Sequence, residues 1–251
     1  MNNSAKELNF SIEGEGPNLV LIHGFLESNR MWDPLKLEED FQCIKIELPG
    51  HGESKITNPE RTIAFMAECI KSTLDSLKIE EFSLIGHSLG GYVALEFASL
   101  FGLTGKLILL HSNFWEDDAQ KKIDRQRVAN IVLKNKNLFL NEALPALFIQ
   151  PKKHFSVINN LLLEAKKMTA NAIAESSLSM QNRKDHRSTL EKFSSEISII
   201  QGEMDRLVPH EKMREMLDGL ENKILIIPKT GHMGQHENTD LIRSSILTLL
   251  A

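Results

Sequence analysis

Residues 82–91 read Phe82-Ser83-Leu84-Ile85-Gly86-His87-Ser88-Leu89-Gly90-Gly91. The first four residues predict a buried strand, and residues 89–101 predict a helix that is apolar nearly all round. A serine between glycines at this junction predicts a sharp, strained turn, because any Cβ would clash where strand and helix approach each other. Such a turn lifts the Ser88 hydroxyl above the end of the strand, at a helix N-terminus whose dipole favours developing negative charge.

The setting of this Gly-x-Ser-x-Gly motif carries more weight than its letters, which occur by chance about 0.1 times in a chain of this composition. A strand before the serine and a helix after it are what a nucleophile on such a turn requires. We therefore predict that Ser88 is a nucleophile and that the backbone N–H of Leu89 is one donor to an oxyanion. The alternative is a glycine-rich turn in which the serine only caps the helix.

Apolar runs with polar or glycine ends flank this stretch on both sides and are typical of buried parallel strands. They cover residues 18–22, 42–48, 106–110, 197–200 and 223–227. Apolar residues from Ile63 to Leu77 recur at helical spacing between two of the runs. The pattern predicts an α/β fold with a mostly parallel central sheet flanked by helices.

Residues 113–195 differ from the rest, because they are helical in pattern, rich in charge and poor in strand signals. We predict an α/β core formed by residues 1–112 and 196–251, interrupted by an all-helical cap insertion at 113–195. Since both ends of the insertion leave the same edge of the sheet, the insertion is expected to cover the site as a lid.

A serine hydroxyl needs a base, and the base needs an acid that fixes its tautomer. His232 follows the last apolar strand, and Asp205 follows the strand before it, so both are expected at the sheet edge that carries Ser88. The competing bases are His236 and His87. The competing acids are Glu203 and the pair Asp117 and Asp118.

A second oxyanion donor is expected from the loop after residues 18–22, where His23-Gly24-Phe25 stands. The backbone N–H of Phe25 is our candidate. Gly24 allows a sharp turn, and His23 is interpreted as a side chain that braces the loop.

Several motifs together resemble the α/β-hydrolase superfamily. Residues 20–25 resemble its oxyanion segment, and residues 47–54 (Glu-Leu-Pro-Gly-His-Gly-Glu-Ser) resemble its DLPGHGxS loop, with Glu47 in place of the usual aspartate. Residues 86–91, 202–209 and 231–232 resemble the nucleophile, acid and base segments. The resemblance implies triad roles for Ser88, Asp205 and His232 in the family's chain order, and oxyanion roles for Phe25 and Leu89.

The insertion is expected to line the substrate pocket, because binding residues commonly lie on variable elements over a fixed scaffold. We expect Arg125 and Arg127 to be solvated, with contact to a substrate carboxylate as the alternative. Arg183 and Asp185 are expected to form a local ion pair. The candidate substrate-binding residues, for which core packing is the alternative, are His111, Phe114, Trp115, Phe139 and Phe148, with Phe25 and Phe155 beside them.

Composition excludes several other functions. The chain has 251 residues, of which 41% are hydrophobic. Its formal net charge of −5 argues against a general affinity for nucleic acid, which needs clustered Lys and Arg. No apolar run approaches the length of a membrane span, and the first six residues do not resemble a signal peptide. Two isolated cysteines suit a reducing cytoplasm. We expect a monomer or homodimer whose partner is a small-molecule substrate, with no metal or cofactor.

The expected activity is hydrolysis of a small to medium carboxylic ester, thioester or lactone through an acyl-enzyme on Ser88. Two alternatives remain open. The chain is also similar to the menaquinone-pathway synthases that eliminate pyruvate, and that reading requires arginines near Ser88. Some members of the fold keep the triad but serve as small-molecule receptors with slow turnover.

Overall fold

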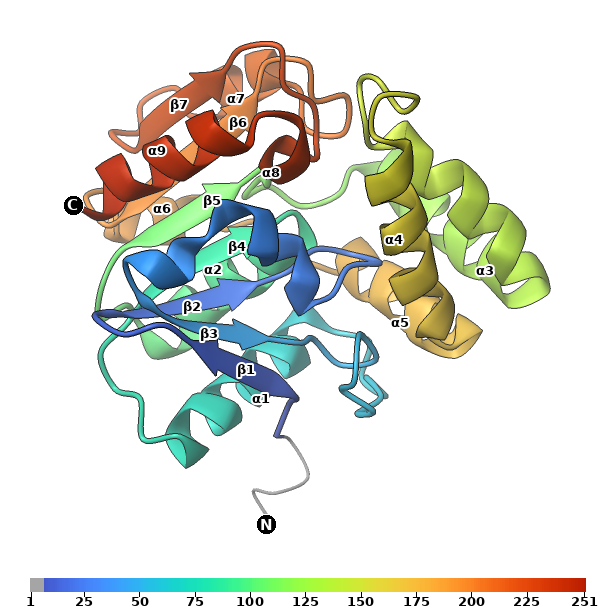
Figure 1. The fold of residues 1–251 in the computed structure, drawn as a ribbon, viewed down its shortest axis with the longest axis horizontal. Helices are drawn as coiled ribbons and strands as arrows, with labels where there is room; N and C mark the ends of the chain where they lie inside the picture. The colour runs from blue at the N-terminus through green and yellow to red at the C-terminus, as the bar shows by residue number, and fades with distance from the viewer. Residues whose placement is uncertain (1–6) are drawn as a thin grey trace.

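The computed structural model describes residues 7–251 and contains a seven-stranded sheet (Figure 1). The strand order is β1-β3-β2-β4-β5-β6-β7, and every neighbouring pair is parallel except β1 with β3. The strands are β1 (Phe10–Glu13), β2 (Asn18–Ile22), β3 (Gln42–Ile46), β4 (Ser83–His87), β5 (Leu107–Leu110), β6 (Ile197–Gly202) and β7 (Lys223–Ile227).

The predicted α/β fold with a mostly parallel sheet is confirmed. Strand β1 was not predicted, because its four residues lie at the sheet edge and are largely exposed, so they show no buried apolar pattern. Residues 1–6, to which the statement about a signal peptide refers, lie outside the described residues. Among residues 7–251, no helix has the length and hydropathy that crossing a membrane requires.

Helices cover both faces of the sheet, so the strands from β3 to β6 in the sheet order bury both of their faces. In β2, Val20 and Ile22 face one apolar cluster, while Leu19 and Leu21 face the other. The first cluster includes residues of α1 (Ile63–Ser76), α2 (Leu89–Phe101), α6 (Arg187–Lys192) and α7 (His210–Met216). The second includes residues of the 3₁₀ segments η2 (Asn29–Leu35) and η3 (Leu37–Glu39) and of helix α9 (Thr239–Leu250).

Three helices between β5 and β6 stand beyond the edge of the sheet (Figure 1). They are α3 (Ala119–Ala146), α4 (Phe155–Lys167) and α5 (Ala170–Gln181). Their apolar side chains form a third cluster, which Leu26 from the loop after β2 joins. Helix α3 is interrupted at Asn135, where φ is −152° and ψ is 78°. Helix α6, although within the predicted insertion, contributes Leu190 to the core beside the sheet.

The carboxyl ends of β2, β4, β6 and β7 lie at one edge of the sheet because these strands are parallel. The segments that follow them are residues 23–27, Ser88, residues 203–208 and residues 228–233. The short helix α8 (Gly234–Glu237) comes after the last of them. Segments that are far apart in the chain are therefore brought together at this edge.

The turn between β4 and α2 holds Ser88 at φ 50° and ψ −114°, a conformation that costs a non-glycine residue free energy. The surrounding glycines leave no room for side chains. A Cβ on Gly86 would collide with the carbonyl of Gly90, and one on Gly90 would collide with the carbonyl of Ile22. The backbone N–H of Ser88 donates to the carbonyl of Leu110 at 3.0 Å, which fixes the turn against β5.

Gly90→Ala is expected to lower the free energy of unfolding by about 3 kcal/mol or more, because its Cβ would overlap backbone atoms that cannot move aside. Urea unfolding measures this difference. Gly102→Ala is the control, since Gly102 has φ 84° but nothing within 4 Å of its Cβ position, so only backbone strain of about 1–3 kcal/mol is added. Equal losses in the two variants would contradict the packing account.

Candidate active site

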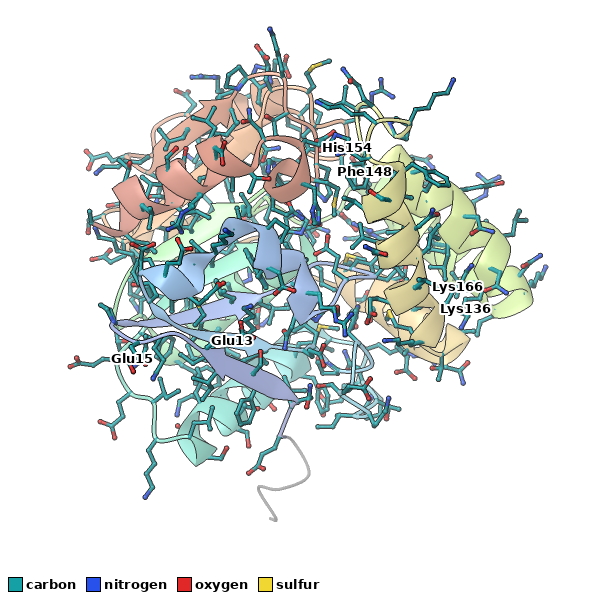
Figure 2. All side chains as sticks on the ribbon, in the orientation of Figure 1. Glu13, Glu15, Lys136, Phe148, His154 and Lys166 are labelled. Atoms are coloured by element: carbon teal, nitrogen blue, oxygen red, sulfur yellow. The ribbon has the colours of Figure 1, made fainter. Side chains whose placement is uncertain are left out.

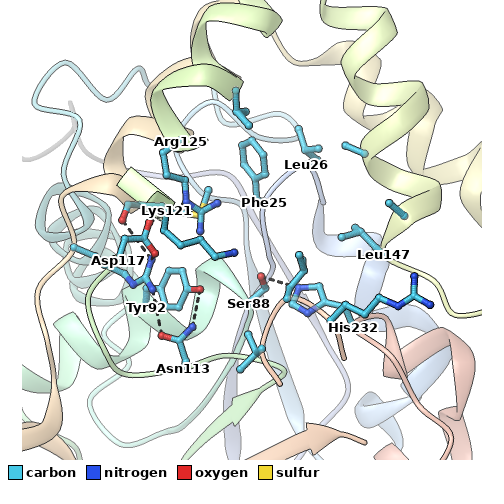
Figure 3. A pocket seen from close by; sticks show the side chains of 18 of the residues that line it. Phe25, Leu26, Ser88, Tyr92, Asn113, Asp117, Lys121, Arg125, Leu147 and His232 are labelled. Atoms are coloured by element: carbon cyan, nitrogen blue, oxygen red, sulfur yellow. Dashed lines mark hydrogen bonds and ion pairs between the residues drawn. The ribbon is translucent and has the colours of Figure 1, made fainter. Parts of the chain in front are cut away.

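Ser88, His232 and Asp205 form one continuous chain of hydrogen bonds at the sheet edge. Figure 3 shows the contact between the Ser88 hydroxyl and His232. Nε2 of His232 lies 3.0 Å from the Ser88 hydroxyl, and Nδ1 lies 2.8 Å from Oδ2 of Asp205. With Nδ1 protonated, the imidazole donates to the carboxylate and offers the lone pair of Nε2 to the hydroxyl. The arrangement can therefore take the proton of Ser88.

The Asp205 carboxylate is buried and held by several donors besides His232. Its Oδ1 accepts the backbone N–H groups of Leu207 and Val208, and its Oδ2 accepts the side-chain amide of Gln201 at 2.8 Å. Burial alone raises the pKa of Asp205, but the His232 charge and these hydrogen bonds outweigh it, so the pKa lies below that of an ordinary aspartate. The carboxylate stays ionised and fixes the tautomer of His232.

His111 lies behind this relay and does not line the substrate cavity, which corrects the prediction for this residue. Its ring is fully buried, its Nδ1 accepts the N–H of Gly202 at 3.1 Å, and the same atom lies 3.8 Å from Oδ2 of Asp205. Burial lowers the pKa of His111 to about 3, so the ring is neutral. His111 packs as a neutral wall against the acid.

The backbone N–H groups of Phe25 and Leu89 are available to an acceptor. Leu89 is the first residue of α2, where amides have no partner within the helix. Phe25 lies between Gly24, whose N–H donates to Oε2 of Glu27, and Leu26, which has φ 66°. Neither of the two N–H groups donates to another atom within residues 7–251. His23 braces the loop as expected, because its Nε2 accepts the N–H of Leu48.

The competing acids and bases are engaged elsewhere. Oε2 of Glu203 accepts the N–H of Lys229, and Asp117 pairs with arginines. Asp118 accepts the N–H of Lys121 at the start of α3. His87 is turned toward Glu27. The ring of His236 is mostly buried and contacts neither Asp205 nor Ser88.

A cavity of about 510 Å³ opens onto Ser88 and His232, between the sheet edge and helix α3. Three aromatic residues expected there, Phe25, Trp115 and Phe139, line it. Phe114 does not, because its ring is 1% exposed and packs in the core beside the sheet. The remaining apolar lining residues are Leu26, Val128, Ala143, Ala146, Leu147, Met180, Leu207, Val208 and Pro209.

Two further aromatic residues of the insertion lie away from this cavity. Phe148 is buried and stacks on His154 at 5.4 Å between ring centroids (Figure 2). Phe155 is 66% exposed at the start of α4. Neither residue lines the cavity, so the prediction for both is corrected.

One wall of the cavity is charged, and it includes Arg125, for which contact with a substrate carboxylate was the alternative expectation. Arg125 and Arg183 both line it and share the carboxylate of Asp117, at 3.1 Å and 2.5 Å (Figure 3). Arg183 also lies over the ring of Tyr92, 4.1 Å from its centroid. The expected ion pair of Arg183 with Asp185 does not form, and Arg125 is not simply solvated.

Three further cations line the cavity without a carboxylate partner. Within the described residues, the side chains of Lys121, Arg206 and Lys212 form neither an ion pair nor a hydrogen bond. The ammonium group of Lys121 points toward Ser88 (Figure 3), and Lys212 lies 5.4 Å from the Trp115 ring centroid. The carboxylates that line the cavity already pair with other groups or lie at the start of α3. The unpaired cations on this wall can therefore bind an anionic group of a substrate.

The family model for the alpha/beta hydrolase fold matches residues 17–239. The chain belongs to the α/β-hydrolase family. An esterase from Thermogutta terrifontis, solved with malate bound, shares 26% identity with this family member at a TM-score of 0.88, over 97% of this chain and 94% of that one.

Two curated relatives of this α/β hydrolase match most of its length. The 2-succinyl-6-hydroxy-2,4-cyclohexadiene-1-carboxylate synthase of Escherichia coli is 27% identical over 93% of this chain and 94% of its own. The dihydrolipoyllysine-residue acetyltransferase component of an acetoin cleaving system from Pseudomonas putida is 28% identical over 96% of this chain. The chain spans 65% of the length of this second relative.

Sequence reasoning about this α/β hydrolase missed Glu27, Tyr92, Gln201 and the contact of Arg183 with Asp117. Glu27 stands three residues after Gly24, a spacing that allows a side chain to accept the amide of its own loop. Gln201 is a buried polar residue directly before the last residue of strand β6. No local sequence pattern predicts the contact of Arg183 with Asp117, since 66 residues separate the two in the chain.

Stability of this α/β hydrolase is expected to fall when the pH is lowered from 7 to 5. Burial lowers the pKa of four histidines: His23, His51 and His111 (both about 3), and His236 (about 4). Below pH 6.5 the unfolded chain therefore binds more protons than the folded chain, at about 1.4 kcal/mol per pH unit for each histidine. The raised pKa of His87 has the opposite effect on the free energy of unfolding, but it is one histidine against four.

Urea unfolding at pH 7 and pH 5 measures this dependence. A free energy of unfolding that is equal or higher at pH 5 would show that these imidazoles are not buried in the neutral form.

Proposed function

We propose that this α/β hydrolase is a serine hydrolase that cleaves a carboxylic ester, thioester or lactone through an acyl-enzyme on Ser88. One observation carries the proposal: the unbroken hydrogen-bond chain from the Ser88 hydroxyl through His232 to Asp205. The amides of Phe25 and Leu89, the cavity over Ser88 and the similarity to an esterase support it.

In the proposed reaction, Oγ of Ser88 attacks the substrate carbonyl carbon while Nε2 of His232 takes the hydroxyl proton. The carbonyl oxygen becomes an oxyanion and accepts the N–H groups of Phe25 and Leu89. The bond from the carbonyl carbon to the leaving group breaks, and His232 gives its proton to that group. Water then attacks the acyl-enzyme by the same steps and releases the acid, which restores Ser88.

The two walls of the cavity favour a substrate with an apolar acyl chain that ends in, or carries, a carboxylate. Leu26 and Leu147 offer apolar surface on one side of Ser88, while Lys121 and Arg125 stand on the other side (Figure 3). A carboxylate between these two cations would gain charge-assisted hydrogen bonds. This charge pattern narrows the expected substrate from a mostly apolar ester to one with an anionic group.

A synthase-type elimination is the second candidate. It is favoured by the 27% identity with the Escherichia coli synthase over 93% of this chain and by the arginines that line the cavity. It would use His232 and Ser88 for proton abstraction and would form no acyl-enzyme. A receptor with slow turnover is distinguished by tight ligand binding without multiple turnovers.

Ser88→Ala and His232→Ala are each expected to lower kcat for p-nitrophenyl esters by about 10⁴-fold or more, and Asp205→Asn by nearly as much. The three residues act as one unit, because His232 moves the proton of Ser88 only while Asp205 holds its ring in the right tautomer and orientation. A fluorophosphonate probe is expected to label the wild-type protein and not Ser88→Ala. Glu203→Gln is the control, since Glu203 holds the Lys229 amide instead.

Full activity of Asp205→Asn would contradict the assignment of the acid. Turnover of no ester of any chain length, together with no labelling of Ser88, would contradict the proposed function as a whole.

Lys121→Gln is expected to reduce the preference for anionic esters. The measurement is the ratio of kcat/KM for mono-p-nitrophenyl adipate to that for p-nitrophenyl hexanoate. Loss of one charged hydrogen bond should lower this ratio about tenfold. Lys122→Gln is the matched control, because Lys122 pairs with Glu116 instead. A ratio that is the same in wild type, Lys121→Gln and Lys122→Gln would place the substrate anion elsewhere or show that there is none.

A further inference from the structure

A second buried carboxylate–imidazole pair, formed by Glu27 and His87, lies beside the triad. Both side chains are only 1% exposed. Oε2 of Glu27 lies 2.9 Å from Nδ1 of His87 and accepts the backbone N–H of Gly24 at 2.6 Å. On the other side of the ring, Nε2 of His87 lies 3.0 Å from the backbone carbonyl of His232.

These contacts determine the protonation of His87. A carboxylate and a carbonyl oxygen only accept hydrogen bonds, so both ring nitrogens must donate, and the ring is an imidazolium. Burial lowers the pKa of His87, but the charge of Glu27 and its hydrogen bond more than compensate, so the pKa is raised. In return the imidazolium holds the pKa of Glu27 at about 2, against the effect of burial.

Each end of the pair contacts a segment that the proposed reaction uses. Gly24 directly precedes Phe25, whose N–H is the proposed oxyanion donor. His87 directly precedes Ser88, and the carbonyl that it binds belongs to His232. The fit at Gly24 is close, since a Cβ there would lie 2.8 Å from both Oε2 of Glu27 and Nδ1 of His87.

We propose that Glu27 is a positioning residue: through Gly24 and the doubly protonated ring of His87, it holds the oxyanion loop and the base loop in register with Ser88. The inference rests on the proposed hydrolase function. It assigns Glu27 no contact with the reacting atoms. Other titratable groups around the His87 ring are His23, His111, Asp205, His232 and His236.

Glutamine cannot replace Glu27 without the loss of one hydrogen bond. The same oxygen of Glu27 accepts from both Gly24 and His87. If the glutamine places its oxygen there, a neutral His87 can donate through Nδ1 only, and the lone pair of Nε2 then faces the His232 carbonyl. If the glutamine places its nitrogen there, two donors meet at Gly24. In either case one hydrogen bond is lost, so the oxyanion loop or the base loop is no longer held.

Glu27→Gln is therefore expected to lower kcat for p-nitrophenyl hexanoate by about 10- to 100-fold, because small displacements of reacting groups cost rates of this order. KM should change less than twofold, since the acyl chain contacts other residues. The matched control is Glu96→Gln. Glu96 also forms a buried pair, with His186 at 3.0 Å, but that pair packs in the second half of α2, away from Ser88.

Both variants should lose stability, and only Glu27→Gln should lose kcat. Wild-type kcat in a folded Glu27→Gln protein would overturn the proposal. If Glu27→Gln does not fold, Glu27→Asp takes its place: the shorter carboxylate keeps the charge but cannot reach both donors, so kcat should fall. A wild-type kcat in Glu27→Asp would overturn the proposal in that case.

Two measurements test the role of Glu27 independently of the proposed hydrolase function. ¹⁵N-histidine NMR at pH 8 should show a doubly protonated ring that is absent from His87→Gln and lost in Glu27→Gln; a singly protonated His87 in the wild type would overturn the proposal. The rate of Ser88 labelling by a fluorophosphonate should fall in Glu27→Gln and not in Glu96→Gln. A wild-type protein that turns over no ester would contradict the hydrolase function, while these two readouts still test Glu27.

Discussion

The conformation of Ser88 is the constraint on which the site depends. The residue is held at φ 50° between β4 and α2, a geometry that the free chain would avoid. The surrounding structure enforces it: the Ser88 amide bonds β5, the Ser88 carbonyl accepts the hydroxyl of Ser112, and glycines at 86 and 90 let strand and helix approach. The free energy that offsets this backbone strain comes from the burial of the apolar clusters on both faces of the sheet. The fold therefore holds the hydroxyl at the edge where the other strands end.

Two buried pairs of the same chemical type lie within one cluster of histidine rings and are suited to different roles. The ring centroids of His87 and His232 are 5.2 Å apart, and each ring is hydrogen-bonded to its own carboxylate. The difference comes from the second ring nitrogen. In His87 it faces a carbonyl, which demands a proton, whereas in His232 it faces a hydroxyl, which can supply one. One pair thus suits a fixed brace, and the other suits proton transfer.

Local pattern was enough to predict the strand positions and the residues that meet at the sheet edge. Residues 18–22 and 223–227 are strands at the predicted bounds, because buried parallel strands read as continuous apolar runs. Topology then brings Ser88, Asp205 and His232 together, since parallel strands share their carboxyl edge. The exposed edge strand β1 had no such pattern.

The cavity was harder to predict, because its lining depends on how the helices between β5 and β6 pack. An aromatic side chain in this part of the chain can face either the core or the cavity. Phe139 faces the cavity and Phe148 does not, although both lie within nine residues of each other. The charged wall arises from Arg183 and Asp117, which meet only after α5 packs on α3. No spacing in the sequence encodes that contact.

In the proposed mechanism, Ser88 becomes covalently acylated during turnover. Rapid acid quenching during hydrolysis of a p-nitrophenyl ester, followed by intact-protein and peptide mass spectrometry, tests this step directly. We expect a mass increase of one acyl group on the peptide that contains Ser88, and none in Ser88→Ala. Steady turnover with an acyl group on another residue, or with no acylated protein under conditions in which formation outpaces hydrolysis, would contradict it.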